Sequence, residues 1–476
     1  MKHLTSIFIC IISVVNSYPQ QDEYITVIGD SLVGRIINGE TVREVYGNVV
    51  LTQGDVVITC NKAIQFIARN EADLIGNVVA KQDSMTITTE EAYYFGDQKK
   101  AKTTAGVKLD DQKVIFTADS GDYYFDEDKA VFKSNVTLFD TTATLTSDEL
   151  IYYKEEDRMI AVDDVRIVQE GNIIQADSLE YFRETRITFA SGNVSIYNPE
   201  NNVQIFGDHL EDYAEKYYTL IDKNPLLIQI DTSYSKRTDT LSLGETDTID
   251  VMKIDTLVIR SFIMEAWRDT IDLFKATDSV RIVRDLFASR NDYTLYQRAE
   301  GKIITYKVNV SASQPVLWYE NSQLTGDSVA IYLRENQIRL LEVFANAFIL
   351  AQNENFPQRF DQTSGERVIL FFEDGELKST EIYGGVLSIY YMFEENEPNG
   401  LSRSSSQSAR IVFDEKEVSE VRLYGSPASE FYPENQVVGK ERTFTLPLFK
   451  FYNNRPTKNE LLSQMANGKR QMGNKQ

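Results

Sequence analysis

Short runs rich in Val, Ile, Thr and aromatic residues alternate with polar tips along most of the chain. In residues 129–157, KAVFKSNVTLFDTTATLTSDELIYYKEED, two such runs flank the break Asp140–Thr142, and the segment closes on the charged tip KEED. Runs of this composition bounded by polar residues predict antiparallel strands joined by hairpins. The chain is therefore expected to be all-β.

The pattern repeats with a fixed period. One valine recurs at intervals of 29 residues, at Val49, Val78, Val107, Val136, Val165 and Val194. A polar marker runs in parallel, at Asn61, Glu90, Asp119, Asp148, Asp177 and, two residues late, Asp208. An aromatic residue follows each marker by five residues, at Phe66, Phe95, Tyr124, Tyr153, Phe182 and Tyr213. A constant period of this length predicts an elongated array of stacked repeats.

The spacing also predicts which way the side chains point. Strand side chains alternate between faces, so residues five apart face opposite sides of a sheet. If Asp148 faces water, Tyr153 faces inward, and the same holds for the other markers and rings. The valines and rings are then expected to form an apolar stripe inside the array. The pair Gly47–Asn48 lies inside a run, which favours a bulge or bend over a complete turn.

Composition changes along the chain divide it into segments. The 29-residue repeats span residues 24–230. Residues 231–255, DTSYSKRTDTLSLGETDTIDVMKID, are rich in Thr, Ser and Asp, which favours a loop or linker. Longer and less regular repeats are expected over residues 256–440. The polar residues 455–476 are expected to be disordered.

The N-terminus has the features of a secretory signal. Lys2 precedes the apolar stretch Leu4–Val15, and Val15–Ser17 ends in small residues. A membrane anchor is the alternative, but this apolar stretch is too short to span a bilayer. We therefore expect residues 1–17 to be cleaved and the mature protein to be exported and soluble.

Charge and cysteine content limit the possible binding partners and disulfides. The formal net charge of −23 disfavours nucleic acid as a partner and electrostatic attachment to an anionic membrane. Of the two cysteines, Cys10 is lost with the signal, so no intrachain disulfide is expected. Cys60 is expected to be a small buried apolar residue.

No motif for catalysis is present. His209 is the single histidine outside the signal, which excludes a multi-histidine metal site and disfavours a Ser-His-Asp triad. The sequence contains no P-loop, nucleophile elbow or HExxH motif. The markers Asp119, Asp148 and Asp177 are expected to be solvated surface residues. We predict no enzyme activity, no catalytic residue, no metal site and no cofactor.

Three stretches resemble one known family. EGNIIQADSLEYF (170–182), NSQLTGDSVAIY (321–332) and VYGNVVLTQGD (45–55) are similar to the repeats of the organic-solvent-tolerance-like family, also called OstA-like or LptA-like. The resemblance implies a periplasmic β-jellyroll, a V-shaped pair of antiparallel sheets whose groove takes the acyl chains of lipopolysaccharide. This chain is longer than the compact carrier of that family, as are the long forms in Bacteroidetes-type bacteria.

The leading hypothesis is therefore a carrier or bridge for lipopolysaccharide transport, with the twelve valines and rings above as its lipid-binding groove. Its expected partners are β-jellyroll domains of inner- and outer-membrane transport proteins, or copies of itself, added at the terminal edges Thr26–Val33 and Val421–Tyr432. One alternative is a structural scaffold or adhesin whose interior is filled by side chains. A second is a solenoid enzyme that acts on extracellular glycans.

Overall fold

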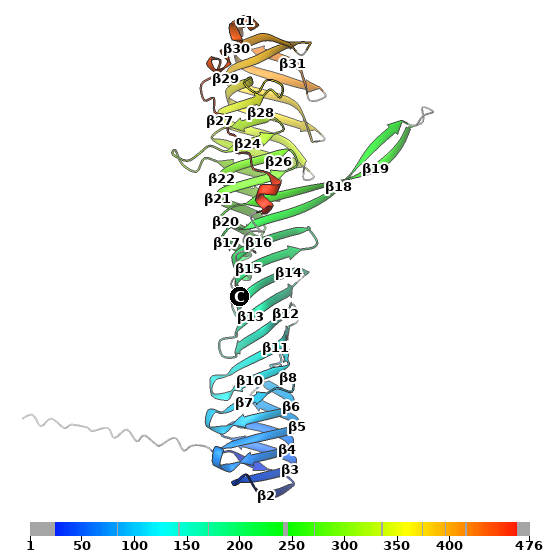
Figure 1. The fold of residues 1–476 in the computed structure, drawn as a ribbon, viewed down its shortest axis with the longest axis vertical. Coiled ribbons are helices and arrows are strands. Elements are labelled where there is room, and N and C mark those ends of the chain that lie inside the picture. The colour runs from blue at the N-terminus through cyan, green and yellow to red at the C-terminus, as the bar shows by residue number, and fades with distance from the viewer. Residues whose placement is uncertain are drawn as a thin grey trace, which may run out of the picture. The chain divides into compact units, whose positions relative to one another are not determined.

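The protein is almost wholly antiparallel β-structure (Figure 1). The computed structural model describes residues 24–82, 84–140, 143–169, 171–240, 246–270, 272–334, 337–373, 375–395, 397–414 and 417–463. They form two compact units, the first of residues 1–141 with 151–155, and the second of residues 142–150 with 156–476. The all-β prediction is confirmed. The expected signal, residues 1–17, and Cys10 lie outside the described residues.

Unit 1 consists of strands with three short 3-10 turns. Its strands are β1 (Thr26–Ile28), β2 (Ser31–Ile37), β3 (Glu40–Gln53), β4 (Val56–Phe66), β5 (Glu71–Gln82), β6 (Met85–Phe95), β7 (Lys100–Thr103), β8 (Val107–Asp110), β9 (Ile115–Ala118), β10 (Ser120–Tyr124) and β11 (Lys129–Phe139). The turns are η1 (Ile67–Arg69), η2 (Gly96–Gln98) and η3 (Phe125–Glu127).

These strands build two layers. The first half of β6 pairs with β8, and its second half pairs with β7. Likewise, β11 pairs with β10 through one half and with β9 through the other. A first layer therefore contains β8 and β9, a second layer contains β7 and β10, and each long strand contributes one half to each layer. The core of unit 1 lies between the layers.

Each long strand passes from one layer to the other at a bend. In β3, Gly47 and Asn48 have φ values of 72° and 46°, and the register with β4 shifts there. Positive φ is unfavourable for most residues and natural for glycine. Gly47 is also required by space, because a Cβ atom would lie 2.4 Å from Asp30 Oδ2. The predicted bend at the Gly-Asn pair is confirmed.

The marker residues support these bends. The amide of Asn135 donates to Asp119 Oδ2 at 2.6 Å, and the amide of Asn193 donates to Asp177 Oδ2 at 2.9 Å. Asp119 and Asp177 thus each hold the bend of a following strand by a hydrogen bond. These aspartates are exposed, as the sequence predicts.

Unit 2 continues the same architecture with more strands. They are β12 (Ala143–Tyr153, whose last residues belong to unit 1), β13 (Arg158–Gln169), β14 (Asn172–Phe182), β15 (Ile187–Asn198), β16 (Val203–Tyr213), β17 (Tyr218–Asp222), β18 (Leu226–Thr240), β19 (Thr246–Arg260), β20 (Ile263–Trp267), β21 (Leu273–Arg284), β22 (Phe287–Gln297), β23 (Lys302–Tyr306), β24 (Val316–Tyr319), β25 (Ser322–Thr325), β26 (Ser328–Arg334), β27 (Gln337–Gln352), β28 (Phe360–Glu373), β29 (Glu376–Glu394), β30 (Glu397–Asp414), β31 (Glu417–Tyr424) and β32 (Ala428–Pro433). The short helices are η4 (Ala214–Lys216), α1 (Glu434–Val437) and η5 (Glu441–Thr443).

The predicted loop over residues 231–255 is wrong. Strands β18 and β19 pair in unbroken register from Leu226 opposite Arg260 to Thr240 opposite Thr246, forming a long hairpin (Figure 1). The Thr-rich composition suits strands, because β-branched residues favour extended backbone. The division into two units also falls near residues 141–156 and not at this hairpin.

The start of the predicted disordered tail is ordered. Residues 434–463 run back along unit 2, where Leu446, Tyr452 and Leu461 contact successively earlier strands. Leu461 is fully buried against Val258 and Trp318. We call residues 434–463 the C-terminal strap. Sequence composition missed it because its stabilising contacts join residues far apart in the chain.

Candidate functional site

The valine series lies in the interior, as the sequence predicts. All six members, from Val49 to Val194, are at most 8% exposed. In unit 1 the valines sit beside a second apolar row that crosses the first layer from strand to strand. Its members are direct cross-strand neighbours: Leu51, Ile58, Ala80, Ile87, Leu109, Phe116 and Leu138. Together they line the space between the layers.

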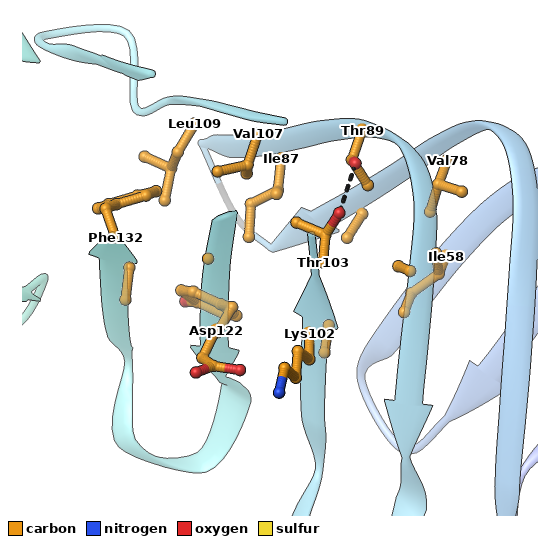
Figure 2. Close-up of a pocket in the computed structure, with 16 residues that line it drawn as sticks. Ile58, Val78, Ile87, Thr89, Lys102, Thr103, Val107, Leu109, Asp122 and Phe132 are labelled. Atoms are coloured by element: carbon orange, nitrogen blue, oxygen red, sulfur yellow. Dashed lines mark hydrogen bonds between the residues drawn. The ribbon is translucent and has the colours of Figure 1, made fainter. Parts of the chain in front are cut away.

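This interior contains one small apolar pocket (Figure 2). Figure 2 shows Ile58, Val78 and Leu109 of the first layer facing it. The second layer contributes Ala92, Ala101, Gly121, Tyr123 and Ala130. The cavity volume is about 30 Å³, which is room for no more than a couple of water molecules. Val78 and Val107 are the predicted site residues that it brings together.

The aromatic series points elsewhere, so the predicted orientation of the rings is wrong. Phe66, Phe95, Tyr124, Tyr153, Phe182 and Tyr213 are only partly buried. The rings that fill the interior of unit 1 stand one residue earlier. Tyr94, Tyr123 and Tyr152 are 0%, 4% and 1% exposed.

The bend explains the error. In β6, Met85 and Ala92 are seven positions apart, which in a regular strand would place them on opposite faces. Both are nevertheless buried, and Glu90 and Glu91 between them are both exposed. Two consecutive outward residues at the bend reverse the alternation of the strand. A ring five residues after a marker therefore faces the same side as the marker, and the ring four residues after it faces inward.

The partly buried rings form contacts on the outer face instead. Lys100 and Lys129 flank Tyr124, with their ammonium groups 4.7 Å and 5.3 Å from the centre of its ring. Lys129 also lies 5.7 Å from the ring centre of Tyr153. These distances are those of cation–π interactions, which stabilise neighbouring strands without creating an apolar site.

Hydrogen bonds close the layers of unit 1 at their turn ends. The Tyr94 hydroxyl donates to Gln53 Oε1 at 2.7 Å, and the Gln53 amide donates to the Gly96 carbonyl at 3.0 Å. Gln53 ends the first-layer half of β3, whereas Tyr94 and Gly96 belong to the second layer. Burial raises the pKa of Tyr94 well above its usual value, so its hydroxyl remains a protonated donor.

Part of the chain matches a known protein family. Residues 29–156 match the family model of OstA-like protein. This OstA-like segment spans unit 1 with all of its predicted repeats. No curated protein is significantly similar in sequence to the chain.

Among the solved structures that are similar to part of this chain is a periplasmic protein. It is LptH of Pseudomonas aeruginosa, described as the LptA-homologous periplasmic component of the conserved lipopolysaccharide transport device. The similarity covers 36% of this chain and 84% of that chain, with 16% sequence identity and a TM-score of 0.12. A superposition this poor is no evidence for a shared function.

Unit 2 also has a row of apolar cross-strand neighbours, and these side chains are less buried than those of the row in unit 1. Four isoleucines are direct cross-strand neighbours on β13 to β16: Ile167, Ile174, Ile196 and Ile205. All four are only partly buried, whereas their counterparts Leu109 and Leu138 in the OstA-like segment are at most 5% exposed. We call these four residues the isoleucine row. Their row continues to Leu227, which is 4% exposed.

The described residues offer little for other chemistry. No cluster of three His, Cys, Asp or Glu residues among them could hold a metal ion. His209 contacts Glu211 at 3.2 Å. Cys60 is 5% exposed, and burial raises the pKa of its thiol. Among the same residues, no helix has the length and apolar character needed to cross a membrane.

Proposed function

We propose that this protein carries lipopolysaccharide in the periplasm by holding its acyl chains against the apolar interior between the two layers. The observation that carries the proposal is the isoleucine row, an unbroken apolar strip that stays partly exposed. The OstA-like repeats support it, because the family that they resemble transports this lipid. An acyl chain gains about 0.8 kcal/mol for each methylene removed from water, so such a strip can hold a lipid without polar contacts.

Acyl chains are proposed to bind next to Ile174 and Ile196, with Val165 and Val194 behind them. The net charge of −23 would repel phosphorylated sugars, so the head group should project away from the protein.

A photocrosslinking residue in place of Ile196 tests the proposal. After loading with lipopolysaccharide, the crosslinker at position 196 should capture lipid. The same crosslinker in place of Tyr197, the exposed neighbour on β15, should not. Replacing Ile174 with Asp should reduce capture, with Gln175→Asp on the opposite face as the matched control. Equal capture at Ile196 and Tyr197, or none, would reject lipid carriage by this strip.

The scaffold function remains the competing proposal. It is favoured in unit 1, where the pocket of about 30 Å³ leaves no room for an acyl chain as the layers stand. A scaffold predicts no lipid capture at any inner position of either unit.

We further propose that the terminal strands join similar β-modules by edge addition. Within the described residues, β2 pairs only with β3, and β31 pairs only with β30. Both expose apolar side chains, with Ile36 77% and Val421 54% exposed. Unpaired strand edges recruit further strands. Proline in place of Leu423 removes a backbone donor and should weaken association in sedimentation; full association would exclude this edge.

A further inference from the structure

Three buried tyrosines and their partners recur in phase with the repeat. The tyrosines Tyr94, Tyr123 and Tyr152 are 29 residues apart, and so are the acceptors Gln53, Gln82 and Asp111. Each hydroxyl donates to the acceptor 41 residues earlier, at 2.7, 2.7 and 2.9 Å. We call these three bonds the tyrosine clasps.

The position of the clasps decides how unit 1 can open. The two layers are joined covalently by every bend, so they can separate only at their turn ends. The clasps lie at those ends, because Gln53 and Gln82 are the last residues of β3 and β5. Gln82 also donates to the carbonyl of Phe125 in the second layer, at 3.4 Å. The clasps therefore act at the free side of a hinge.

The pocket between the layers has a mostly apolar lining. Its first-layer wall is aliphatic, and small residues on the second layer leave it unfilled. Its hydroxyl groups are already paired, since Thr89 bonds to Thr103 at 2.8 Å and to the Gly106 carbonyl at 2.7 Å. Two charged residues, Lys102 and Asp122, also line the pocket, and Asp122 lies 3.3 Å from the ammonium group of Lys100. Away from these two residues, a polar ligand would lose its hydrogen bonds to water without gaining new ones.

We propose that the tyrosine clasps shut a second acyl-chain site in unit 1, which opens when they release. The inference rests on the proposed function, because it assigns the same ligand class to a different segment. The occupant is a single acyl chain lying along Ile58, Ala80 and Leu109. The clasp hydroxyls act as positioning groups, since they hold the layers together, although the ring of Tyr123 also lines the pocket.

Labelling with a photoactivatable fatty acid tests this on the full chain. In the unaltered protein, label should map to the isoleucine row and be scarce in unit 1. The triple variant Tyr94→Phe, Tyr123→Phe, Tyr152→Phe keeps the rings and removes the donors. It should gain at least tenfold more label on strands β4, β5 and β8, with label on the isoleucine row unchanged.

The matched control is Tyr46→Phe, Tyr93→Phe, Tyr197→Phe, which removes three hydroxyls outside the clasps and should leave the labelling pattern unaltered. Circular dichroism and hydrogen exchange of the bend amides show that each variant is folded, and the single variant Tyr123→Phe serves if the triple one is not. Unit 1 labelling that is the same with and without the clasps overturns the inference. Absence of label from both units in every protein rejects the proposed function, and this site with it.

Discussion

Tyr123 and Tyr124 are adjacent residues of the same type, and the structure predicts very different roles for them. Tyr123 is 4% exposed, its hydroxyl bonds to Gln82 and its ring contacts Phe125 edge-on at 4.8 Å. Truncating a buried aromatic side chain costs about 3–5 kcal/mol. Tyr123→Ala should therefore destabilise unit 1 by about 4 kcal/mol. Tyr124→Ala should cost about 1–2 kcal/mol, because it loses a half-buried ring and cation–π contacts worth about 0.5–1 kcal/mol.

Pulsed hydrogen exchange in graded urea measures this locally, on peptides covering residues 120–140. With a urea dependence of about 2 kcal/mol per molar, the local midpoint should fall by about 2 M for Tyr123→Ala and by less than about 1 M for Tyr124→Ala. Equal shifts, or a larger shift for Tyr124→Ala, would falsify the assignment of the inward ring and restore the orientation inferred from simple alternation.

Four further changes test other parts of the fold. Gly47→Ala places a Cβ atom against Asp30 in a left-handed backbone and should cost at least about 1–2 kcal/mol in a urea titration; no loss would mean that the bend adapts. Asp119, Asp148 and Asp177, each changed to Asn, should shift stability by no more than about 0.5 kcal/mol per site, and a loss of several kcal/mol would show that they are essential to the bends. Burial raises the pKa of Asp361 to about 7; because the unfolded carboxyl is already ionised above about pH 4, stability should fall as pH rises from about 4 to about 7, and Asp361→Asn should remove that slope in thermal unfolding. Leu461→Asp places a charge at the buried contact of the C-terminal strap and should release the strap, so that trypsin cuts after Lys450 or Lys458 far faster than in the unaltered protein; unchanged cleavage would show that Leu461 does not hold the strap.

The sequence predicts the strands and bends of the array well, because each structural repeat corresponds to one 29-residue repeat in the sequence. Val49 and the five valines that follow it recur because each 29-residue repeat places one side chain at the same position in the core. The Gly47–Asn48 pair predicts its bend because glycine and asparagine tolerate positive φ. These are local preferences, and they survive wherever the repeat survives.

Contacts between distant residues were harder to predict. The bend adds one outward residue, so alternation counted across it assigned Tyr124 to the interior instead of Tyr123. Consecutive apolar residues, such as Val316, Leu317 and Trp318, are buried on both faces of their strand. However, nothing local identifies Leu461, near the end of the chain, as the cover of the outer face. The repeated glutamine at Gln53 and Gln82 was visible in the sequence, but its partner is 41 residues away.

The hinge geometry links the energetics of the repeat to lipid carriage. The bends make one side of the two-layer unit permanent, whereas the other side depends on side-chain hydrogen bonds that contribute about 1 kcal/mol each. Releasing Tyr94 from Gln53 leaves a buried acceptor unpaired and costs about 1–3 kcal/mol, before counting the apolar side chains that separating the layers would expose. Burying about two to four methylene groups would offset that cost at about 0.8 kcal/mol each. Opening a repeat needs more buried methylenes than this, so unit 1 stays closed to acyl chains while its clasps hold. Under the proposed function, an acyl chain would bind first at the partly exposed isoleucine row, while the clasps of unit 1 remain closed.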